Sequence, residues 1–187
     1  MRLLLATRNA HKVREFGRLL PGLELDPLPD DVVTPPESGA TYAENALIKA
    51  RAAAAATGRP AIADDSGIEA EAIGWAPGVY SARYAGVGAT DAENLAKLRE
   101  EAPAGSRLRY TCVLVWTDGA TEHAFTGRCT GTMSADAVGE RGFGYDPVFR
   151  PDEHPERTMA ELDDDEKDAI SHRGRAARAL AAWRNGG

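Results

Sequence analysis

Two adjacent carboxylates that follow a short apolar segment are the residues of this chain best suited to chemistry. The segment Ala61–Ala63 predicts a buried strand, and it leads directly into Asp64 and Asp65, which are followed by Ser66-Gly67. Buried carboxylates are costly unless a cation meets them, and ligands collect at the C-terminal ends of strands in α/β proteins. The pattern therefore indicates a metal ion or a reacting group. The alternative is an Asx turn, in which these side chains bind nearby backbone N–H groups.

A second candidate lies near the N-terminus, where a predicted strand leads into a predicted helix. Leu3–Ala6 is apolar, Thr7–Lys12 is polar, and a helical pattern of apolar residues then continues to Pro21-Gly22. The first turn of a helix binds anions through its unpaired N–H groups and its dipole, and Lys12 adds a cation. The chain contains neither G-x-G-x-x-G nor G-x-x-x-x-G-K-[ST], which excludes the Rossmann and P-loop motifs. The alternative is that Lys12 is a solvated helix residue.

A predicted loop carries another carboxylate just before a second helix. Asp30–Ala40 contains Pro35-Pro36, and Glu37 follows this rigid pair. Thr41-Tyr42-Ala43-Glu44 is a capping box, which predicts a helix that continues to Thr57. Functional residues often gather on such loops, because a rigid scaffold holds the loop in place. Glu44 has the alternative interpretation of a helix cap alone.

Two predicted helices place polar side chains where they could bind oxygen atoms. Asn45 and Lys49 are four residues apart and therefore share one helix face, although Lys49 could equally be an exposed charge. Ser171, His172 and Arg173 lie at the N-terminus of the last predicted helix. N–H donors, an imidazole and a guanidinium together suit carbonyl and phosphate oxygens.

The middle of the chain predicts a β-hairpin followed by an aromatic loop. Leu108–Thr117 and Thr121–Met133 are β-prone and flank Asp118-Gly119, a hairpin turn signal. In Arg141–Pro147, two glycines flank Phe143 and would let the backbone approach a flat ligand. The aromatic ring could stack on a base, or the loop could simply fill the core.

Composition excludes several classes of protein. The chain has 187 residues and a net charge of −7, whereas a general nucleic-acid binder normally has a basic face. No apolar run approaches the roughly 20 residues that span a membrane. Cys112 and Cys129 have no C-x-x-C spacing, so we expect reduced, structural, cytosolic cysteines rather than a zinc site.

Five motifs agree in their order and spacing. They are Ala6-Thr7-x-Asn9-x-x-Lys12, Glu44-Asn45-Ala46-x-x-Lys49-Ala50, Asp64–Gly67 with Pro77–Tyr84, Gly142–Pro147, and Ala160-Glu161-Leu162 with Lys167 and Ser171–Gly174. Together they resemble the inosine/xanthosine triphosphate pyrophosphatase family, from Leu4 to about Ala177. The resemblance implies Mg²⁺-dependent hydrolysis of deaminated purine nucleoside triphosphates, such as ITP, dITP, XTP and dXTP, to the monophosphate and pyrophosphate.

The resemblance also implies roles for individual residues. Asp65 is expected to be the general base and a metal ligand, with Glu37 as the second metal ligand and Glu44 and Asp64 as alternatives. Thr7 to Lys12 would form the triphosphate loop. The full set of expected substrate contacts is Thr7, Arg8, Asn9, Ala10, His11, Lys12, Lys49, Ser66, Arg83, Phe143, Gly144, Tyr145, Asp146, Lys167, His172 and Arg173.

The chemistry of the purine base fits this expected substrate class in part. A deaminated purine has a carbonyl where adenine has an amine, so a pocket of hydrogen-bond donors accepts the first and rejects the second. Guanine also has this carbonyl, so the same donors do not reject it.

The expected architecture is an α/β fold, with an elongated mixed β-sheet flanked by helices and two lobes around a central substrate cleft. Residues 1–187 would form a single nucleoside-triphosphate pyrophosphatase domain, in which the hairpin at about 108–149 makes one lobe. We expect a cytoplasmic homodimer that binds neither nucleic acid nor a membrane; the dimer is implied by the resemblance alone.

Two alternatives remain open. The first is a pyrophosphatase for modified pyrimidine nucleotides, and the second is a nucleotide sensor without turnover. A sensor has no need of a base such as Asp65 beside a metal. A serine hydrolase is disfavoured because the chain has no G-x-S-x-G, and a glycosidase because adjacent residues cannot supply two separated carboxylates.

Overall fold

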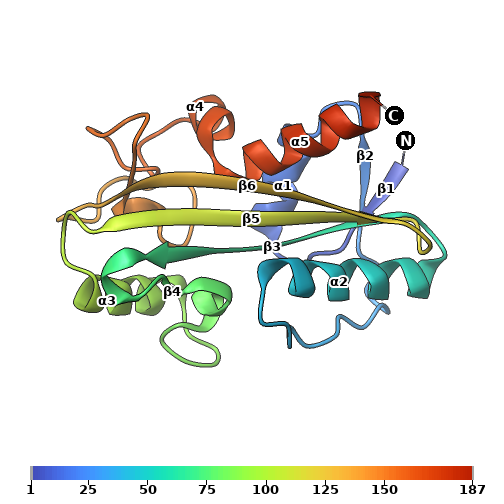
Figure 1. Cartoon of the computed structure of the whole chain (residues 1–187), viewed down its shortest axis with the longest axis horizontal. Coiled ribbons are helices and arrows are strands. Elements are labelled where there is room, and N and C mark those ends of the chain that lie inside the picture. The colour runs from blue at the N-terminus through green and yellow to red at the C-terminus, as the bar shows by residue number, and fades with distance from the viewer. Residues whose placement is uncertain (1, 187) are drawn as a thin grey trace. The chain divides into compact units, whose positions relative to one another are not determined.

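The chain folds around one mixed β-sheet (Figure 1). The structure, a computed structural model, describes residues 2–186. Within these residues, seven strands form the sheet in the order β2-β1-β3-β5-β6-β7, with β4 paired to β3. β1 is parallel to β2 and β3, whereas β4 and β7 are antiparallel to β3 and β6. The strands are β1 (Arg2–Leu5), β2 (Glu24–Pro27), β3 (Ala61–Ala70), β4 (Ala76–Pro77), β5 (Arg107–Thr117), β6 (Glu122–Met133) and β7 (Phe149–Pro151).

Helices flank this sheet, as predicted. The α-helices are α1 (Ala10–Leu19), α2 (Tyr42–Thr57), α3 (Asp91–Glu101), α4 (Asp164–Ile170) and α5 (His172–Gly186). Short 3₁₀ helices are η1 (Glu71–Ile73), η2 (Gly78–Arg83) and η3 (Asp146–Val148). The predicted capping box of α2 is confirmed, because Thr41 and Glu44 each accept a hydrogen bond from the other's backbone N–H. Across residues 2–186, no helix is long and apolar enough to cross a membrane.

The described residues divide into two compact units. The first unit contains residues 2–65, 112–127 and 173–186, and the second contains residues 66–111 and 128–172. Strands β3, β5 and β6 each contribute residues to both units. The single catalytic domain and the central cleft stay predictions.

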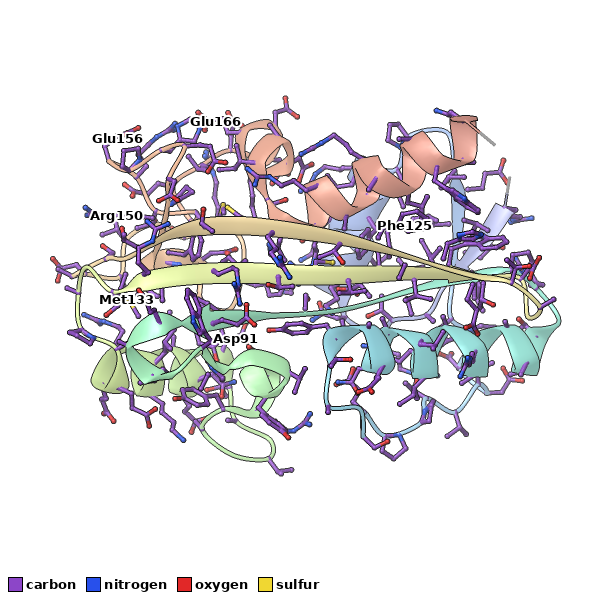
Figure 2. The ribbon with its side chains drawn as sticks, in the orientation of Figure 1. Asp91, Phe125, Met133, Arg150, Glu156 and Glu166 are labelled. Atoms are coloured by element: carbon purple, nitrogen blue, oxygen red, sulfur yellow. The ribbon has the colours of Figure 1, made fainter. Side chains whose placement is uncertain are left out.

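The first unit has a core on the side of the sheet that α1 and α5 cover. Phe16 of α1 and Leu180 of α5 pack with Leu114 of β5 and Phe125 of β6, which is labelled in Figure 2. Helix α2 lies on the other side of these strands (Figure 1). It buries mainly alanines, and small side chains let a helix pack closely on a sheet. Side chains of β3 in the first unit can therefore contact α1 and α5 on one face of the sheet and α2 on the other.

The second unit has its own apolar core. The Tyr110 and Phe149 rings pack at a tilt of 34° with their centroids 4.6 Å apart, and Leu98, Met159 and Leu162 pack in the same cluster. These residues come from β5, β7, α3 and the segment before α4. The cluster supports the loop at 141–147, which the sequence singled out.

One local prediction is wrong. Asp64 and Asp65 lie inside β3, which continues to Ala70, rather than in a turn after Ala63. The prediction followed from Asp-Asp-Ser-Gly, which is typical of turns. The strand continues because cationic and polar side chains from other segments meet both carboxylates, and sequence spacing does not reveal those partners.

The two cysteines are free and buried, as predicted. Burial raises the pKa of Cys112, and the nearby Asp64 carboxylate raises it further.

Because a thiolate is the reactive form, we expect neither thiol of the native protein to react with DTNB within minutes. Both should react after unfolding in urea, as measured by absorbance. Rapid release of one equivalent of thionitrobenzoate from the native protein would contradict the burial of both thiols.

Candidate active site

Strand β3 presents its two carboxylates to opposite faces of the sheet, because successive side chains of a strand alternate. Asp64 meets Lys12 of α1 and Arg173 of α5. Asp65 meets α2, and both groups of contacts lie within the first unit. The adjacent aspartates therefore have separate surroundings and can have separate roles.

Asp65 is a nearly buried carboxylate beside two side chains of α2. The Asn45 side-chain amide donates to Asp65 Oδ2 at 3.0 Å, and Lys49 Nζ lies 3.8 Å from Asp65 Oδ1. Burial raises the pKa of Asp65; Lys49 and Asn45 lower it in part, and the Glu37 carboxylate adds to the increase. A carboxylate with a raised pKa is a better proton acceptor than a solvated one, which suits a general base.

Glu37 and Asp65 share one cation. Lys49 Nζ lies 2.5 Å from Glu37 Oε1 as well as near Asp65. Burial lowers the pKa of Lys49, but Asp64, Asp65 and Glu37 outweigh it and raise the pKa, so the ammonium stays charged. Within residues 2–186, no group of three or more His, Cys, Asp or Glu side chains could hold a metal ion. Two carboxylates close enough to share a cation fit Mg²⁺, which completes its shell with water and phosphate oxygens.

The two alternative metal ligands are engaged elsewhere. Glu44 Oε2 accepts hydrogen bonds from the backbone N–H groups of Ala40 and Thr41, at 2.7 and 3.0 Å. Its carboxylate therefore caps α2 and holds the end of the preceding loop. The Asp64 side chain is fully buried among cations. Glu37 is the candidate whose carboxylate binds the Lys49 ammonium beside Asp65.

Asp64 is the centre of a buried charge network. Lys12 Nζ lies 2.9 Å and Arg173 Nε 3.8 Å from Asp64 Oδ2, and Arg173 Nη1 also donates to Glu15 Oε2 at 3.1 Å. Burial by itself raises the pKa of Asp64, but Lys12, Arg173 and Lys49 lower it to about 2. Asp64 is therefore ionised at neutral pH and holds Lys12 and Arg173 in position.

The predicted triphosphate loop leads into α1 as expected. Asn9 is the N-cap, and its side-chain oxygen accepts from the N–H groups of His11 and Lys12 at 2.9 and 3.2 Å. Thr7 Oγ1 accepts from the Asn9 N–H at 3.2 Å. Ala10 is exposed at the first turn of the helix. The loop thus places the positive end of the α1 dipole beside the Lys12 ammonium, which together favour an anion.

Arg8 holds a neighbouring loop. Its guanidinium donates to the carbonyl oxygens of Val32 at 2.8 Å and Pro29 at 3.1 Å. The structure thus places Arg8 against the segment that leads to Glu37. His11 lies next to Arg14, with Nδ1 and Nη2 2.8 Å apart.

In the second unit, Asp146 joins several of the predicted base-site residues. Asp146 Oδ2 accepts from Lys167 Nζ at 2.8 Å and from the Phe143 N–H at 3.0 Å, and Oδ1 accepts from the Tyr110 hydroxyl at 3.1 Å. Lys167 Nζ also lies 5.4 Å from the centroid of the Phe143 ring. A buried carboxylate thus fixes both an aromatic face and an ammonium group.

Two further contacts fix the loop on either side of Phe143. The Gly144 N–H donates to Asp91 Oδ2 at 2.9 Å, and Figure 2 labels Asp91 at the start of α3. The Tyr145 hydroxyl donates to the Ser81 carbonyl oxygen at 2.7 Å. Tyr145 is therefore a buried anchor of the loop, which leaves half-buried Phe143 as the ring suited to stack on a ligand.

The remaining predicted residues also belong to the second unit. The His172 ring stacks on Tyr110, with centroids 4.6 Å apart and planes 8° from parallel. Ser66 is half-buried in β3, directly after Asp65. The Arg83 guanidinium lies over the exposed Tyr80 ring. Contacts therefore connect His172 to Asp146 through Tyr110.

The sequence matches one protein family along almost its whole length. The model of the Ham1 family matches residues 3–183. This chain belongs to the Ham1 family. It is 47% identical to a dITP/XTP pyrophosphatase of Shigella flexneri over 197 aligned positions, covering 99% of each chain. It is 46% identical to a dITP/XTP pyrophosphatase of Halorhodospira halophila, covering 96% of this chain and 95% of the relative.

Solved structures of Ham1 proteins have the same fold. A HAM1 protein from Coxiella burnetii superposes with a TM-score of 0.89 at 38% identity, over 100% of both chains. A nucleoside-triphosphatase / dITP/XTP pyrophosphatase from Mycobacterium abscessus gives a TM-score of 0.72 at 43% identity, over 98% of both chains. The resemblance drawn from the five motifs is thereby confirmed.

The resemblance assigned no role to three residues that contact predicted site residues of this Ham1 protein. Glu15 binds Arg173, Tyr110 joins Asp146 to His172, and Asn45 donates to Asp65. For Asn45 a signal was present, since it shares a helix face with Lys49. Glu15 and Tyr110 come from segments remote in sequence from their partners, so spacing gave no signal for them.

The Asp146–Lys167 pair depends on a glycine. Gly142 has φ +73°, and a side chain there would overlap the Asp146 carboxylate and lie 3.0 Å from Lys167 Nζ. We expect Gly142→Ala to lower the free energy of unfolding by about 2–3 kcal/mol, which combines left-handed strain with displacement of the pair. Urea denaturation followed by tryptophan fluorescence measures the change.

Gly144→Ala is the matched control. Gly144 has a similar φ of +63°, but no atom lies within 4 Å of the added methyl group. This variant should lose only the strain energy, about 1 kcal/mol. Equal losses in the two variants would show that crowding of Asp146 has no energetic consequence.

Proposed function

We propose that this chain hydrolyses deaminated purine nucleoside triphosphates to the nucleoside monophosphate and pyrophosphate. The observation that carries the proposal is the environment of Asp65: a nearly buried carboxylate with a raised pKa, beside Lys49 and Glu37. The relatives named dITP/XTP pyrophosphatase, at 46–47% identity over almost the whole chain, support the choice of substrate.

Asp65 acts as the general base in this proposal. It takes a proton from a water molecule whose oxygen attacks the α-phosphorus, and the bond from that phosphorus to the bridging oxygen breaks. Pyrophosphate leaves with the electron pair of that bond. The attacking oxygen stays on the nucleoside monophosphate.

The cations of the first unit bind the phosphate chain. Lys12, Lys49 and the first turn of α1 attract a polyanion and offset charge that develops on the leaving pyrophosphate. Asp64 keeps Lys12 and Arg173 in place through its ion pairs with both. The Thr7–Lys12 loop is therefore proposed as the triphosphate site.

Asp65 and Glu37 are proposed to hold Mg²⁺ together with phosphate oxygens. When bound, the ion would neutralise phosphate charge and lower the pKa of a bound water. Lys49 is proposed to keep the two carboxylates near each other and to bind a phosphate oxygen.

The second unit is proposed to bind the base. Phe143 provides an aromatic face, and Lys167 beside it provides a donor for the carbonyl of hypoxanthine or xanthine. Adenine has an amine at this position, which would leave the donor unpaired, and unpaired buried donors are costly. His172 and Ser66 are proposed as further substrate contacts, and Arg83 as an additional phosphate ligand.

Product analysis tests the proposal. The protein is incubated with Mg²⁺ and, separately, ITP, XTP, GTP and ATP, and pyrophosphate is assayed against orthophosphate. We expect IMP or XMP with pyrophosphate, and little product from ATP or GTP. Release of orthophosphate with a nucleoside diphosphate would place the attack at the γ-phosphorus and overturn the proposal. Turnover of modified pyrimidine triphosphates alone would replace the substrate class.

We also propose that the protein works in the cytoplasm and, as the resemblance implied, as a homodimer. Light scattering coupled to size exclusion measures the mass in solution. A mass of one chain at micromolar concentration would contradict the dimer.

A further inference from the structure

Asn45 is a polar residue where α2 otherwise buries small apolar ones. It is 0% exposed, like its neighbours Ala46 and Ala50 on the same helix. A buried amide costs free energy unless its donor and acceptor both find partners, and asparagine is a poorer helix former than alanine. Packing and helix propensity would both favour alanine at this position. The side chain must therefore gain from specific contacts.

The two ends of the Asn45 amide bind two different segments. Its Nδ2 group donates to Asp65 Oδ2 at 3.0 Å, and its Oδ1 atom accepts from the Gly39 N–H at 2.8 Å. The carboxylate needs a donor and the backbone N–H needs an acceptor, so the two partners together fix the orientation of the amide. Asn45 thus connects β3 to the loop that carries Glu37.

Gly39 makes this connection possible. A side chain there would place its first carbon 2.6 Å from Glu44 Cβ and 2.8 Å from Asn45 Oδ1, closer than atoms can approach. The backbone of the loop therefore rests directly on α2. Glu37 lies two residues before Gly39 in this loop. Its carboxylate binds Lys49, which lies one turn after Asn45 on the same face of α2.

From these contacts we infer that Asn45 is a positioning residue that holds Asp65 and the Glu37 loop in register with each other. It touches neither the substrate nor the attacking water in this account. Its donor fixes which Asp65 oxygen is left to face the reacting water, and its acceptor fixes the loop. This inference rests on the proposed role of Asp65.

Two substitutions separate the two contacts. Asn45→Asp keeps an acceptor for the Gly39 N–H but replaces the donor that faces Asp65. Asn45→Ala removes both. We expect kcat for ITP to fall by about 10²-fold in each, because small displacements of a reacting group have effects of this size. Affinity for the unreactive α,β-methylene analogue of ITP should change by less than about threefold, since the phosphate-binding cations are kept.

Thr41→Ala is the matched control. Thr41 caps the same helix end by accepting from the Glu44 N–H at 3.2 Å, and Asp65 is not among its hydrogen-bond partners. Loss of the cap should lower the melting temperature while kcat stays within twofold. If Thr41→Ala lost as much kcat as the Asn45 variants, helix stability rather than positioning would be responsible, and the inference would fail.

Amide hydrogen exchange gives a readout that does not require turnover. The Gly39 N–H should exchange slowly in the wild-type protein and in Asn45→Asp, and rapidly in Asn45→Ala. Fast exchange of Gly39 in the wild-type protein would overturn the inference even if both variants failed to fold, and so would a folded Asn45→Asp with kcat within threefold of wild type. Absence of any nucleotide hydrolysis by the wild-type protein would instead refute the proposed function.

Discussion

Replacement of Asp65 by asparagine is expected to reduce kcat for ITP by about 10³-fold while the protein stays folded. Asparagine has nearly the same shape but cannot accept a proton from water, and general bases contribute 10²–10⁴-fold. The amide also removes the negative charge that would bind Mg²⁺. The rate of pyrophosphate release measures the loss, and circular dichroism confirms the fold.

Asp152→Asn serves as the control for this substitution. Asp152 is an exposed carboxylate paired with Arg107, outside every cluster described above. Its variant should keep kcat within twofold, because exposed ion pairs contribute little. Activity of folded Asp65→Asn within tenfold of wild type would remove Asp65 from the role of base.

Replacement of Asp64 by asparagine should have the largest effect on stability. The carboxylate is fully buried, and its removal takes an ion-pair partner from both Lys12 and Arg173. Breaking a buried ion pair on one side typically costs 3–5 kcal/mol, so we expect a loss of about 4 kcal/mol in the free energy of unfolding. Urea denaturation at pH 7 measures it.

Glu24→Gln provides the comparison for Asp64→Asn. Glu24 is an exposed partner of Arg2, with 79% of its side chain accessible. An exposed pair of this kind contributes about 0–1 kcal/mol, so the variant should unfold at nearly the wild-type urea concentration. A loss below about 1 kcal/mol in Asp64→Asn would mean that the buried network does not stabilise the fold.

The sequence predicted most elements of the fold because their signals are local. The capping box at Thr41 and Glu44, the Asp118-Gly119 turn and the apolar run of β1 each depend on neighbouring residues. The wrong prediction, a strand end before Asp64, depended on distant residues. Only the folded chain brings Lys12 and Arg173 to that carboxylate.

The sequence also predicted several residues of the candidate site. The motifs contain Asp65 and Lys49, and the resemblance implied Glu37 as a further ligand; the structure brings all three together. The sequence already favoured Glu37 over Glu44 as the second metal ligand, and the structure adds that the Glu44 carboxylate caps α2. Glu15 and Tyr110 emerged only from side-chain geometry, since their contacts span long stretches of chain. The sequence placed Asn45 beside Lys49, but its two hydrogen bonds depend on amide orientation.

The most direct test of the central claim is hydrolysis of ITP in water enriched in ¹⁸O, with both products analysed by mass spectrometry. Attack on the α-phosphorus, with Asp65 as the base, predicts one ¹⁸O atom in IMP and none in the pyrophosphate released. Label in pyrophosphate would place the attack on the β-phosphorus, and label in orthophosphate would place it on the γ-phosphorus. Either result would contradict the role of general base that we propose for Asp65.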